Sequence, residues 1–248
     1  MQVNEKGVKM QNQKSDWLLS SPIAHRGLWN ENLIENSLPA YENAVKNGYP
    51  IEIDIYQTTD EQLVCFHDKT LLRMTGDNRN IYDCDLATLK SLNLLDSSEK
   101  IPTLKELLAL VNGKVPLLIE LKDQPNKNYV KNVVELLKTY KGEFAIQSFN
   151  PFYINKVRKL APTFRRGILG THVAKEEKPL VRFVIKHLPF NFLIKPQFIS
   201  YCYSKLPLKK SKTKKLPVLA WTITDKQTYL DIKPYCDNII FEKFIPEK

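Results

Sequence analysis

Short apolar runs alternate with amphipathic stretches along most of the chain. Several apolar runs, such as Pro116–Lys122, end in a polar tip, which is typical of strands buried on both faces of a parallel sheet. The pattern predicts strands at Ile23–His25, Ile51–Gln57, Leu63–His67, Pro116–Lys122, Phe144–Phe149, Gly167–Leu169, Phe198–Ser200, Val218–Ile223 and Asn238–Phe241.

Helical patterns lie between these runs. Thr103 precedes the run Leu104–Val111 and is followed three residues on by Glu106, which together form a capping box. Further amphipathic stretches predict helices at Ser37–Asn47, Asn126–Tyr140, Pro151–Leu160 and Asp225–Ile232. Strand and helix alternate about eight times, which favours an α/β fold, a TIM (β/α)8 barrel, over a β-sandwich or a helix bundle.

The length and the segment boundaries predict one domain. A chain of 248 residues has the usual size of a single barrel of this kind. We expect the domain over residues 14–248, after a polar start that runs to about Gln13. The stretch 69–100 fits the alternation poorly, so we expect a small insertion there, after the predicted strand that ends at His67.

Carboxylates gather near the ends of two predicted strands, where the chemistry of a TIM barrel is expected. Glu52 and Asp54 lie two residues apart and share one face of their strand, and Glu120 and Lys122 do likewise. Carboxylates that converge on one barrel mouth repel one another unless one holds a proton or a cation lies between them. Oxygen ligands of this kind favour Mg²⁺ or Ca²⁺. Taken alone, either pair is also explained as a salt-bridged strand end.

Two of the four histidines end predicted strands. Imidazole has a pKa near neutrality, so His25 and His67 suit the roles of general acid and general base. Arg26 follows His25 directly and can bind a phosphate through its planar fork. Together with a metal, these groups meet the needs of phosphodiester cleavage. His172 and His187 lack such neighbours and are expected to lie on the surface or in the core.

An ordered series of motifs resembles the glycerophosphodiester phosphodiesterase family. Its most specific part is H-R-G at His25–Gly27, E-I-D at Glu52–Asp54, H-D at His67–Asp68 and I-E-L-K at Ile119–Lys122. The similarity spans roughly Ile23 to Ile245 and includes Glu35–Ser37, Ala44–Gly48, Thr58–Asp60, Leu71–Gly76, Ile101–Leu104, Gln147–Phe149 and Ala220–Thr222.

The resemblance implies a TIM barrel with a small insertion after the H-D motif. It also implies a metal-dependent enzyme that hydrolyses small glycerophosphodiesters to glycerol 3-phosphate and an alcohol. The implied roles are an acid–base pair of His25 and His67, metal ligands Glu52, Asp54 and Glu120 for Mg²⁺ or Ca²⁺, phosphate-binding Arg26 and Lys122, and a pocket-lining Trp221. In a variant of this chemistry, the free glycerol hydroxyl attacks phosphorus and water then opens the cyclic product.

The chain departs from the usual pattern of that family in three places. Ile34 stands where a proline commonly precedes Glu-Asn, and Glu61 and Gln62 replace a turn that contains glycine. Glu242 lies at a rim position where aspartate is usual. None of these departures removes a proposed catalytic group, and the last is expected to affect which head group fits.

Two other functions remain open on the sequence. One is a phospholipase D-like lipid phosphodiesterase on the same barrel, whose members are typically secreted and disulfide-bonded. Here the cysteines are scattered and are expected to be free thiols: Cys65, Cys84, Cys202 and Cys236. The other is a non-catalytic module that binds anionic lipid or phosphate, which a lost histidine or metal carboxylate would indicate, and the motifs above retain them all.

The formal charge of +10 is concentrated in residues 173–215, where eleven Lys and Arg stand against two Glu. This segment predicts a weak contact with an anionic membrane surface, or else a solvated basic face. Nucleic acid is not an expected partner, because no recognisable binding module accompanies the charge. With no legible signal peptide and no apolar run of about 18 residues, we expect a cytoplasmic protein, peripheral at the inner membrane face if the segment binds lipid.

Overall fold

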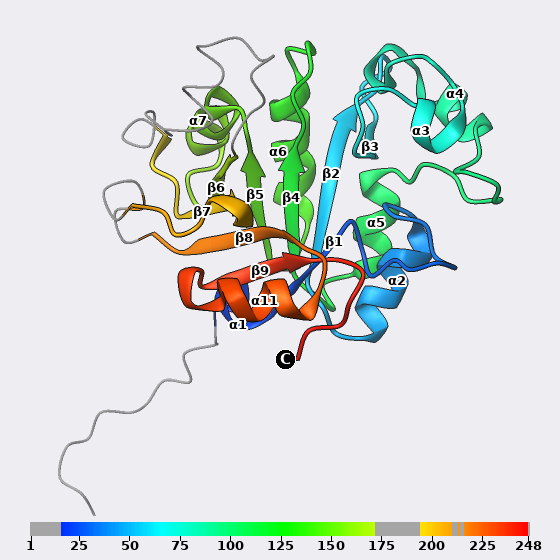
Figure 1. The fold of residues 1–248 in the computed structure, drawn as a ribbon. Helices are drawn as coiled ribbons and strands as arrows, with labels where there is room; N and C mark the ends of the chain where they lie inside the picture. The colour runs from blue at the N-terminus through cyan, green and yellow to red at the C-terminus, as the bar shows by residue number, and fades with distance from the viewer. Residues whose placement is uncertain (1–15, 172–193, 210–212, 214–215, 248) are drawn as a thin grey trace, which may run out of the picture.

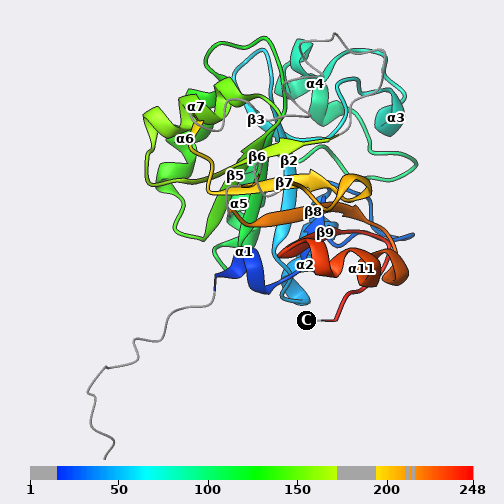
Figure 2. The same cartoon turned by 60° about the vertical axis from the view of Figure 1, so that its left-hand side comes forward.

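Eight parallel strands close into a barrel in the computed structural model, which describes residues 16–171, 194–209, 213 and 216–247 (Figures 1 and 2). β1 pairs with both β2 and β9, which completes the circle. The barrel strands are β1 (Ile23–His25), β2 (Ile51–Gln57), β4 (Leu117–Leu121), β5 (Phe144–Ser148), β6 (Arg165–Gly170), β7 (Phe198–Cys202), β8 (Val218–Ile223) and β9 (Asn238–Phe241). The prediction of a TIM barrel is confirmed.

The ninth strand is not part of the barrel wall. β3 (Leu63–Cys65) is antiparallel to β2, with Cys65 opposite Ile55. The connection from β2 to β3 is the short turn 58–62, closed by a hydrogen bond of 2.9 Å from Thr58 N to Gln62 O. A parallel crossover needs a dozen or more residues, so a connection this short can only make a hairpin. The strand predicted at Leu63–His67 therefore exists, two residues shorter, as an edge strand on β2.

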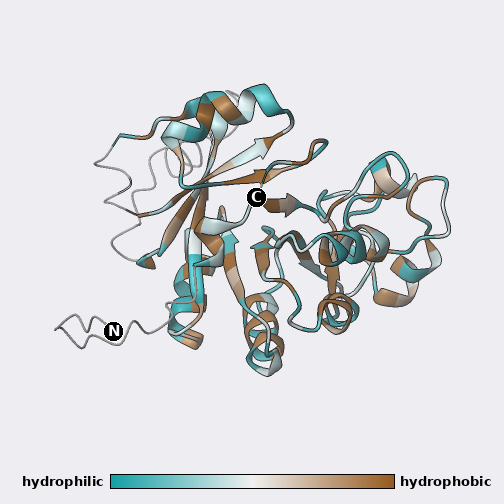
Figure 3. Cartoon of the chain, turned by 90° about the horizontal axis from the view of Figure 1, so that it is seen from below, coloured by the Kyte–Doolittle hydropathy of each residue, from teal (hydrophilic) through white to brown (hydrophobic). Residues whose placement is uncertain are grey.

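Helices pack against the barrel, and all of the following except the first, which was not predicted, lie close to their predicted positions. They are α1 (Trp17–Ser20), α2 (Leu38–Lys46), α5 (Leu104–Val111), α6 (Tyr129–Thr139), α7 (Pro151–Leu160) and α11 (Lys226–Ile232). The capping box of Thr103 and Glu106 is present at the start of α5. α6 begins three residues later than predicted, because the Asn126 side chain accepts from Asn128 N at 3.0 Å and forms a turn outside the helix. Seen from below, the strands are largely hydrophobic and the helices carry both kinds of residue (Figure 3).

The barrel interior is divided into an apolar floor and a polar mouth. Ile23, Leu118, Phe198, Leu219 and Ile240 form a buried cluster inside the barrel. The side chain two residues further along a strand also points into the barrel, and it lies nearer the carboxyl end of that strand. Gly167 leaves room for the ring of Phe198 in this floor, since a Cβ there would lie 2.2 Å from the ring. Polar residues two positions beyond the floor therefore face the mouth of the barrel.

The insertion packs beside the carboxyl ends of the strands (Figure 1). It contains α3 (Leu72–Thr75), the 3₁₀ turn η1 (Ile81–Asp83) and α4 (Leu86–Ser91). Its buried side chains form a separate small core with residues of β2 and β3: Tyr56, Val64, Phe66, Leu71, Met74, Ile81, Cys84, Leu89, Leu94 and Ile101. A small insertion after the H-D motif, as predicted, is thus anchored to the barrel by its own core.

Candidate active site

A cavity of about 130 Å³ opens at the carboxyl ends of the strands. Seven of the predicted site residues line it: His25, Arg26, Glu52, His67, Glu120, Lys122 and Trp221. The eighth, Asp54, is 1% exposed and lies against Lys122, with 2.9 Å between its Oδ1 and the lysine Nζ. The structure therefore brings all the predicted site residues together, although they come from distant parts of the chain, on or just after β1, β2, β3, β4 and β8.

Three carboxylates share one small volume at this mouth. Oxygen atoms of Glu52, Asp54 and Glu120 lie within 4.8 Å of one another, and all three residues are buried. Asp54 stands opposite Glu120 in the parallel pairing of β2 with β4, and Glu52 lies one pleat further down. A gap of this size suits a divalent cation with oxygen ligands at about 2.0–2.6 Å. The residues present thus fit the metal that the sequence predicted.

Two cations of the protein lie against these carboxylates. Lys122 Nζ is 2.8 Å from Glu120 Oε1 as well as 2.9 Å from Asp54 Oδ1, and Arg26 Nε is 3.5 Å from Asp54 Oδ2. Burial alone would lower the pKa of Lys122, but the two carboxylates outweigh it and raise that pKa. Burial opposes ionisation of Asp54, yet Lys122 and the other nearby cations lower its pKa. Asp54 and Lys122 are therefore charged at neutral pH.

Glu52 has the opposite electrostatics. Burial, reinforced by the charges of Asp54 and Glu120, raises the pKa of Glu52 well above its usual range. Its Oε2 accepts from the backbone N of Arg26 at 3.2 Å, where Arg26 has a φ of 58°. Gly27 follows with a φ of 88°, and a Cβ there would lie 3.0 Å from the Ala40 backbone. The tight turn that ends β1 thus places the backbone N–H of Arg26 where it donates to Glu52.

Each histidine has a carboxylate on its Nδ1 atom. His25 Nδ1 lies 2.7 Å from Glu242 Oε2, and His67 Nδ1 lies 2.6 Å from Asp68 Oδ1. Burial would raise the pKa of Glu242, but the hydrogen bond from His25 lowers it, so Glu242 accepts and the imidazole donates. The other ring nitrogen of His25, Nε2, lies on the side of the carboxylate cluster, 4.0 Å from Glu52 Oε2. Burial lowers the pKa of His67, which favours its neutral form.

The segment Glu35–Ser37, with the sequence E-N-S, supplies contacts that support the site. Asn36 Nδ2 donates to Asp54 Oδ2 at 3.2 Å, and Tyr41 OH donates to Asn36 Oδ1 at 2.9 Å. Glu35 Oε1 accepts from Arg26 Nη1 at 2.8 Å, and Ser37 caps α2. The sequence contained the motif but did not assign these contacts. The contacts of Asp68 and Glu242 with the histidines were likewise not predicted, although the adjacent H-D pair was a visible signal for the first.

Aromatic and aliphatic side chains form the remaining wall of the cavity. The rings of Phe149 and Trp221 meet edge to face with 5.7 Å between their centres, and Leu169 lies beside them. The Trp221 Nε1 atom is buried and has no acceptor among the residues that the structure describes. The cavity therefore offers charged groups on one side and an apolar wall on the other.

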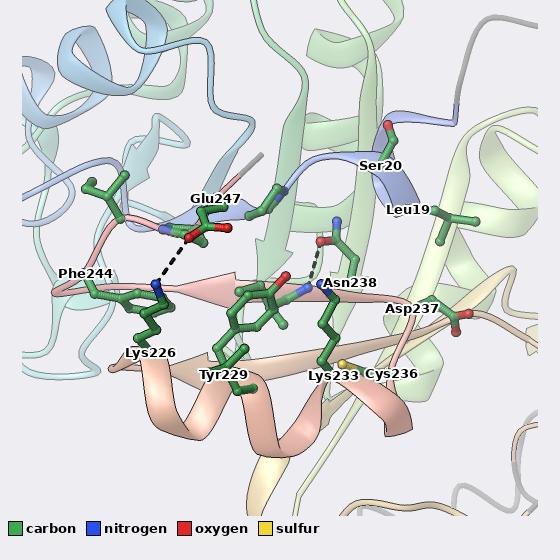
Figure 4. Close-up of a pocket in the computed structure, with 15 residues that line it drawn as sticks. Leu19, Ser20, Lys226, Tyr229, Lys233, Cys236, Asp237, Asn238, Phe244 and Glu247 are labelled. Atoms are coloured by element: carbon green, nitrogen blue, oxygen red, sulfur yellow. Dashed lines mark hydrogen bonds and ion pairs between the residues drawn. The ribbon is translucent and has the colours of Figure 1, made fainter.

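A second cavity, of about 450 Å³, lies beside α11 and is also lined by residues before and after β9 (Figure 4). Lys226 Nζ donates to Glu247 Oε1 at 3.2 Å, and Lys233 Nζ lies 5.4 Å from the ring centre of Tyr229. Among the described residues that line it, none belongs to the predicted site. The groups suited to phosphodiester chemistry are thus concentrated in the smaller cavity at the carboxyl ends of the strands.

Fold and site together define a TIM-barrel protein with a buried carboxylate cluster and two carboxylate-oriented histidines at its catalytic end. A family model described as the glycerophosphoryl diester phosphodiesterase family matches residues 25–241. The chain belongs to this family of phosphoric diester hydrolases.

Similar proteins agree with this assignment. The chain is 31% identical over 219 residues to a glycerophosphodiester phosphodiesterase of Caldanaerobacter subterraneus, covering 83% of this chain and 86% of that protein. A solved phosphodiesterase of Oleispira antarctica, in complex with the product sn-glycerol-3-phosphate, superimposes with a TM-score of 0.76 at 25% identity, over 91% and 93% of the two chains. A human lysophospholipase D is 38% identical over 143 residues, which are 52% of this chain and 45% of that protein.

Several sequence predictions concern residues that the structure does not describe. His172, His187 and most of the basic segment 173–215 lie outside the described residues. In the part of that segment that the structure describes, Lys205 and Lys209 are exposed. Within the described ranges, no helix is long and apolar enough to cross a membrane. The cysteines Cys65, Cys84, Cys202 and Cys236 are free thiols, as expected. The single domain over 14–248, the cytoplasmic location, the membrane contact and the absence of a nucleic-acid partner stay predictions.

Proposed function

We propose that the protein is a metal-dependent phosphodiesterase that hydrolyses glycerophosphodiesters to glycerol 3-phosphate and an alcohol. The observation that carries the proposal is one cavity in which a cluster of three carboxylates meets two histidines held by carboxylates. The glycerol 3-phosphate bound to the similar Oleispira antarctica enzyme supports the same substrate class.

The residues divide the reaction between them. Arg26 and Lys122 bind the phosphate oxygens and neutralise their charge. One of the pair His25 and His67 takes the proton of the attacking hydroxyl, and the other gives a proton to the leaving alkoxide. When water attacks, the P–O bond to water forms as the P–O bond to the alcohol breaks. When the free glycerol hydroxyl attacks, the same bond breaks and water then opens the cyclic phosphate, so either route consumes one water molecule. Trp221 lines the pocket against the glycerol or the leaving group.

A divalent cation held by Glu52, Asp54 and Glu120 would supply Lewis-acid stabilisation of the phosphate charge. We propose Mg²⁺ or Ca²⁺, because all three side chains offer only oxygen ligands. Lys122 already contacts Asp54 and Glu120 in the protein alone, so it contributes a second positive charge beside the cluster.

The affinity for Mg²⁺ or Ca²⁺ is expected to rise with pH, because the carboxyl group of Glu52 must lose its proton to bind the ion. Without metal, the raised pKa of Glu52 keeps a proton on its carboxyl group. The metal must displace that proton, so binding releases it and becomes tighter as the pH approaches the raised pKa. Titration calorimetry in buffers of different ionisation enthalpy measures both the metal affinity and the number of protons released on binding. A constant affinity without proton release would contradict this account of Glu52.

Glu242→Gln is expected to lower kcat about tenfold or more, a part of the 10²–10⁴-fold that a positioned acid or base supplies. Glutamine can still accept from His25 Nδ1, but it lacks the charge that stabilises the protonated imidazole. Glu247→Gln is the matched control, because this carboxylate is 88% exposed and pairs with Lys226 away from the cavity. Equal kcat values for the two variants would show that Glu242 does not orient His25.

A lysophospholipase D activity is the second candidate, favoured by the similarity to the human enzyme of that name. The two activities share the chemistry and differ in whether the glycerol carries an acyl chain. We predict faster turnover of the deacylated diester, because the cavity is small, at about 130 Å³.

The test is a substrate panel of glycerophosphocholine, glycerophosphoethanolamine and lysophosphatidylcholine, with Mg²⁺ or Ca²⁺. The proposal expects glycerol 3-phosphate from the first two. Release of choline from lysophosphatidylcholine alone would favour the second candidate, and no turnover of any substrate would reject both.

A further inference from the structure

We propose that Arg73 of the insertion is a positioning residue, which holds His67 and Arg26 in place through their carboxylate partners. The inference rests on the function proposed above and concerns a residue that touches neither the carboxylate cluster nor the catalytic cavity. It gives the insertion a part in the chemistry of the barrel.

The guanidinium of Arg73 bridges two carboxylates. Its Nε donates to Asp68 Oδ2 at 2.6 Å and its Nη2 to Asp68 Oδ1 at 3.1 Å, which is a bidentate pair. The same Nη2 atom donates to Glu35 Oε1 at 2.6 Å. Arginine is suited to this role because its rigid fork fixes the direction of each bond, whereas a lysine provides a single point charge.

Each bridged carboxylate holds one group of the proposed site. Asp68 Oδ1 lies 2.6 Å from His67 Nδ1, and Glu35 Oε1 accepts from Arg26 Nη1 at 2.8 Å. A continuous series of hydrogen bonds therefore joins the proposed acid–base histidine to the proposed phosphate ligand. Arg73 lies at its centre, on α3, while the two ends follow β3 and β1.

The surroundings favour a positioning role over a purely stabilising one. Arg73 is 48% exposed, and ion pairs with this much solvent contribute little to stability. Asp68 and Glu35 are more buried, at 23% and 14% exposed, so their orientation depends on the groups they contact. Without Arg73, each carboxylate keeps its site partner but loses the bond that fixes its own rotamer. The protein should stay folded while the site loses its alignment.

The experiment compares Arg73→Ala with Arg79→Ala, a control in the same insertion. Arg79 is 52% exposed and pairs with Asp77, away from the cavity. We expect Arg73→Ala to lower kcat about 10- to 100-fold, as removal of an orienting partner typically does, and Arg79→Ala to change it less than twofold. Added guanidinium ion should restore part of the rate to Arg73→Ala only, and Arg73→Lys should lie between the wild type and Arg73→Ala.

Imidazole ¹⁵N spectra provide a readout that does not depend on turnover. In the wild type and in Arg79→Ala, His67 should show a hydrogen-bonded Nδ1–H, and Arg73→Ala should weaken that signal. If both the spectrum of His67 and the kcat of Arg73→Ala match those of Arg79→Ala, the inference is overturned. Should Arg73→Ala fold poorly, Arg73→Lys takes its place, and a wild-type His67 signal together with a wild-type kcat in Arg73→Lys overturns the inference as well.

An inactive wild type with a His67 signal that changes in Arg73→Ala would reject the proposed function while supporting the positioning role. Full wild-type activity, with no effect of Arg73→Ala on kcat or on the His67 signal, would support the proposed function and reject the positioning role. The two failures are therefore distinguishable.

Discussion

His25→Ala and His67→Ala are each expected to lower kcat by at least about 100-fold, because each removes a positioned proton donor or acceptor. Both imidazoles line the cavity beside the carboxylate cluster, and each donates its Nδ1 proton to a carboxylate. Their Nε2 atoms are then left for proton transfer. Steady-state kinetics on glycerophosphocholine measure the effect.

The double variant is expected to lose much less than the product of the two single losses, because paired catalytic groups act as a unit. His172→Ala and His187→Ala serve as controls, since the sequence predicts no role for either histidine. A wild-type rate in either His25→Ala or His67→Ala removes that residue from the mechanism.

Asp54→Asn is expected to weaken metal binding and to lower kcat by about 100-fold or more, since metal stabilisation of the phosphate is worth several kcal/mol. Asp54 is held in its ionised form, because the cations around it outweigh the effect of burial and lower its pKa. Asparagine has nearly the same shape and can still accept from Asn36, so the barrel should remain folded. Calorimetric titration with Mg²⁺ or Ca²⁺ and thermal unfolding separate the two effects.

Asp123→Asn is the matched control for that substitution. Asp123 is exposed near the end of β4 and accepts from Asn150 at 2.8 Å, outside the carboxylate cluster. We expect it to retain wild-type metal affinity and rate. Should Asp54→Asn bind metal as tightly as Asp123→Asn, Asp54 is not a ligand.

Local periodicity was enough to predict the parts of the site that lie on one strand. Glu52 and Asp54 alternate with the aliphatic residues of β2, so their shared direction follows from the period of two. The same reasoning applies to Glu120, two residues beyond the floor residue Leu118. Strands with one polar mouth end thus reveal both the barrel and its catalytic end.

Contacts between distant segments could not be predicted in this way. Glu242 is 217 residues away from His25 and reaches it because the barrel closes by pairing β1 with β9. Nothing in the local pattern around Glu242 specifies that register. Arg73 lies in a segment whose irregular pattern gave no helix, and its side chain reaches Glu35 only after the insertion has packed on the barrel.

The hairpin of β3 was missed for a different reason. A short apolar run such as Leu63–Cys65 looks the same whether it pairs parallel or antiparallel. The short connection from Gln57 to Leu63 does predict a hairpin, because so few residues cannot cross over to a parallel neighbour. Its consequence is functional, since the hairpin leads the chain to His67 at the barrel mouth.

The most direct test of a metal-dependent glycerophosphodiesterase is the release of glycerol 3-phosphate from glycerophosphocholine before and after chelation. The wild-type protein is treated with excess EDTA, assayed, and assayed again after Mg²⁺ or Ca²⁺ is restored. The account predicts that activity falls to the level of His67→Ala in EDTA and returns with at least one of the two ions. Full activity in excess EDTA would contradict it.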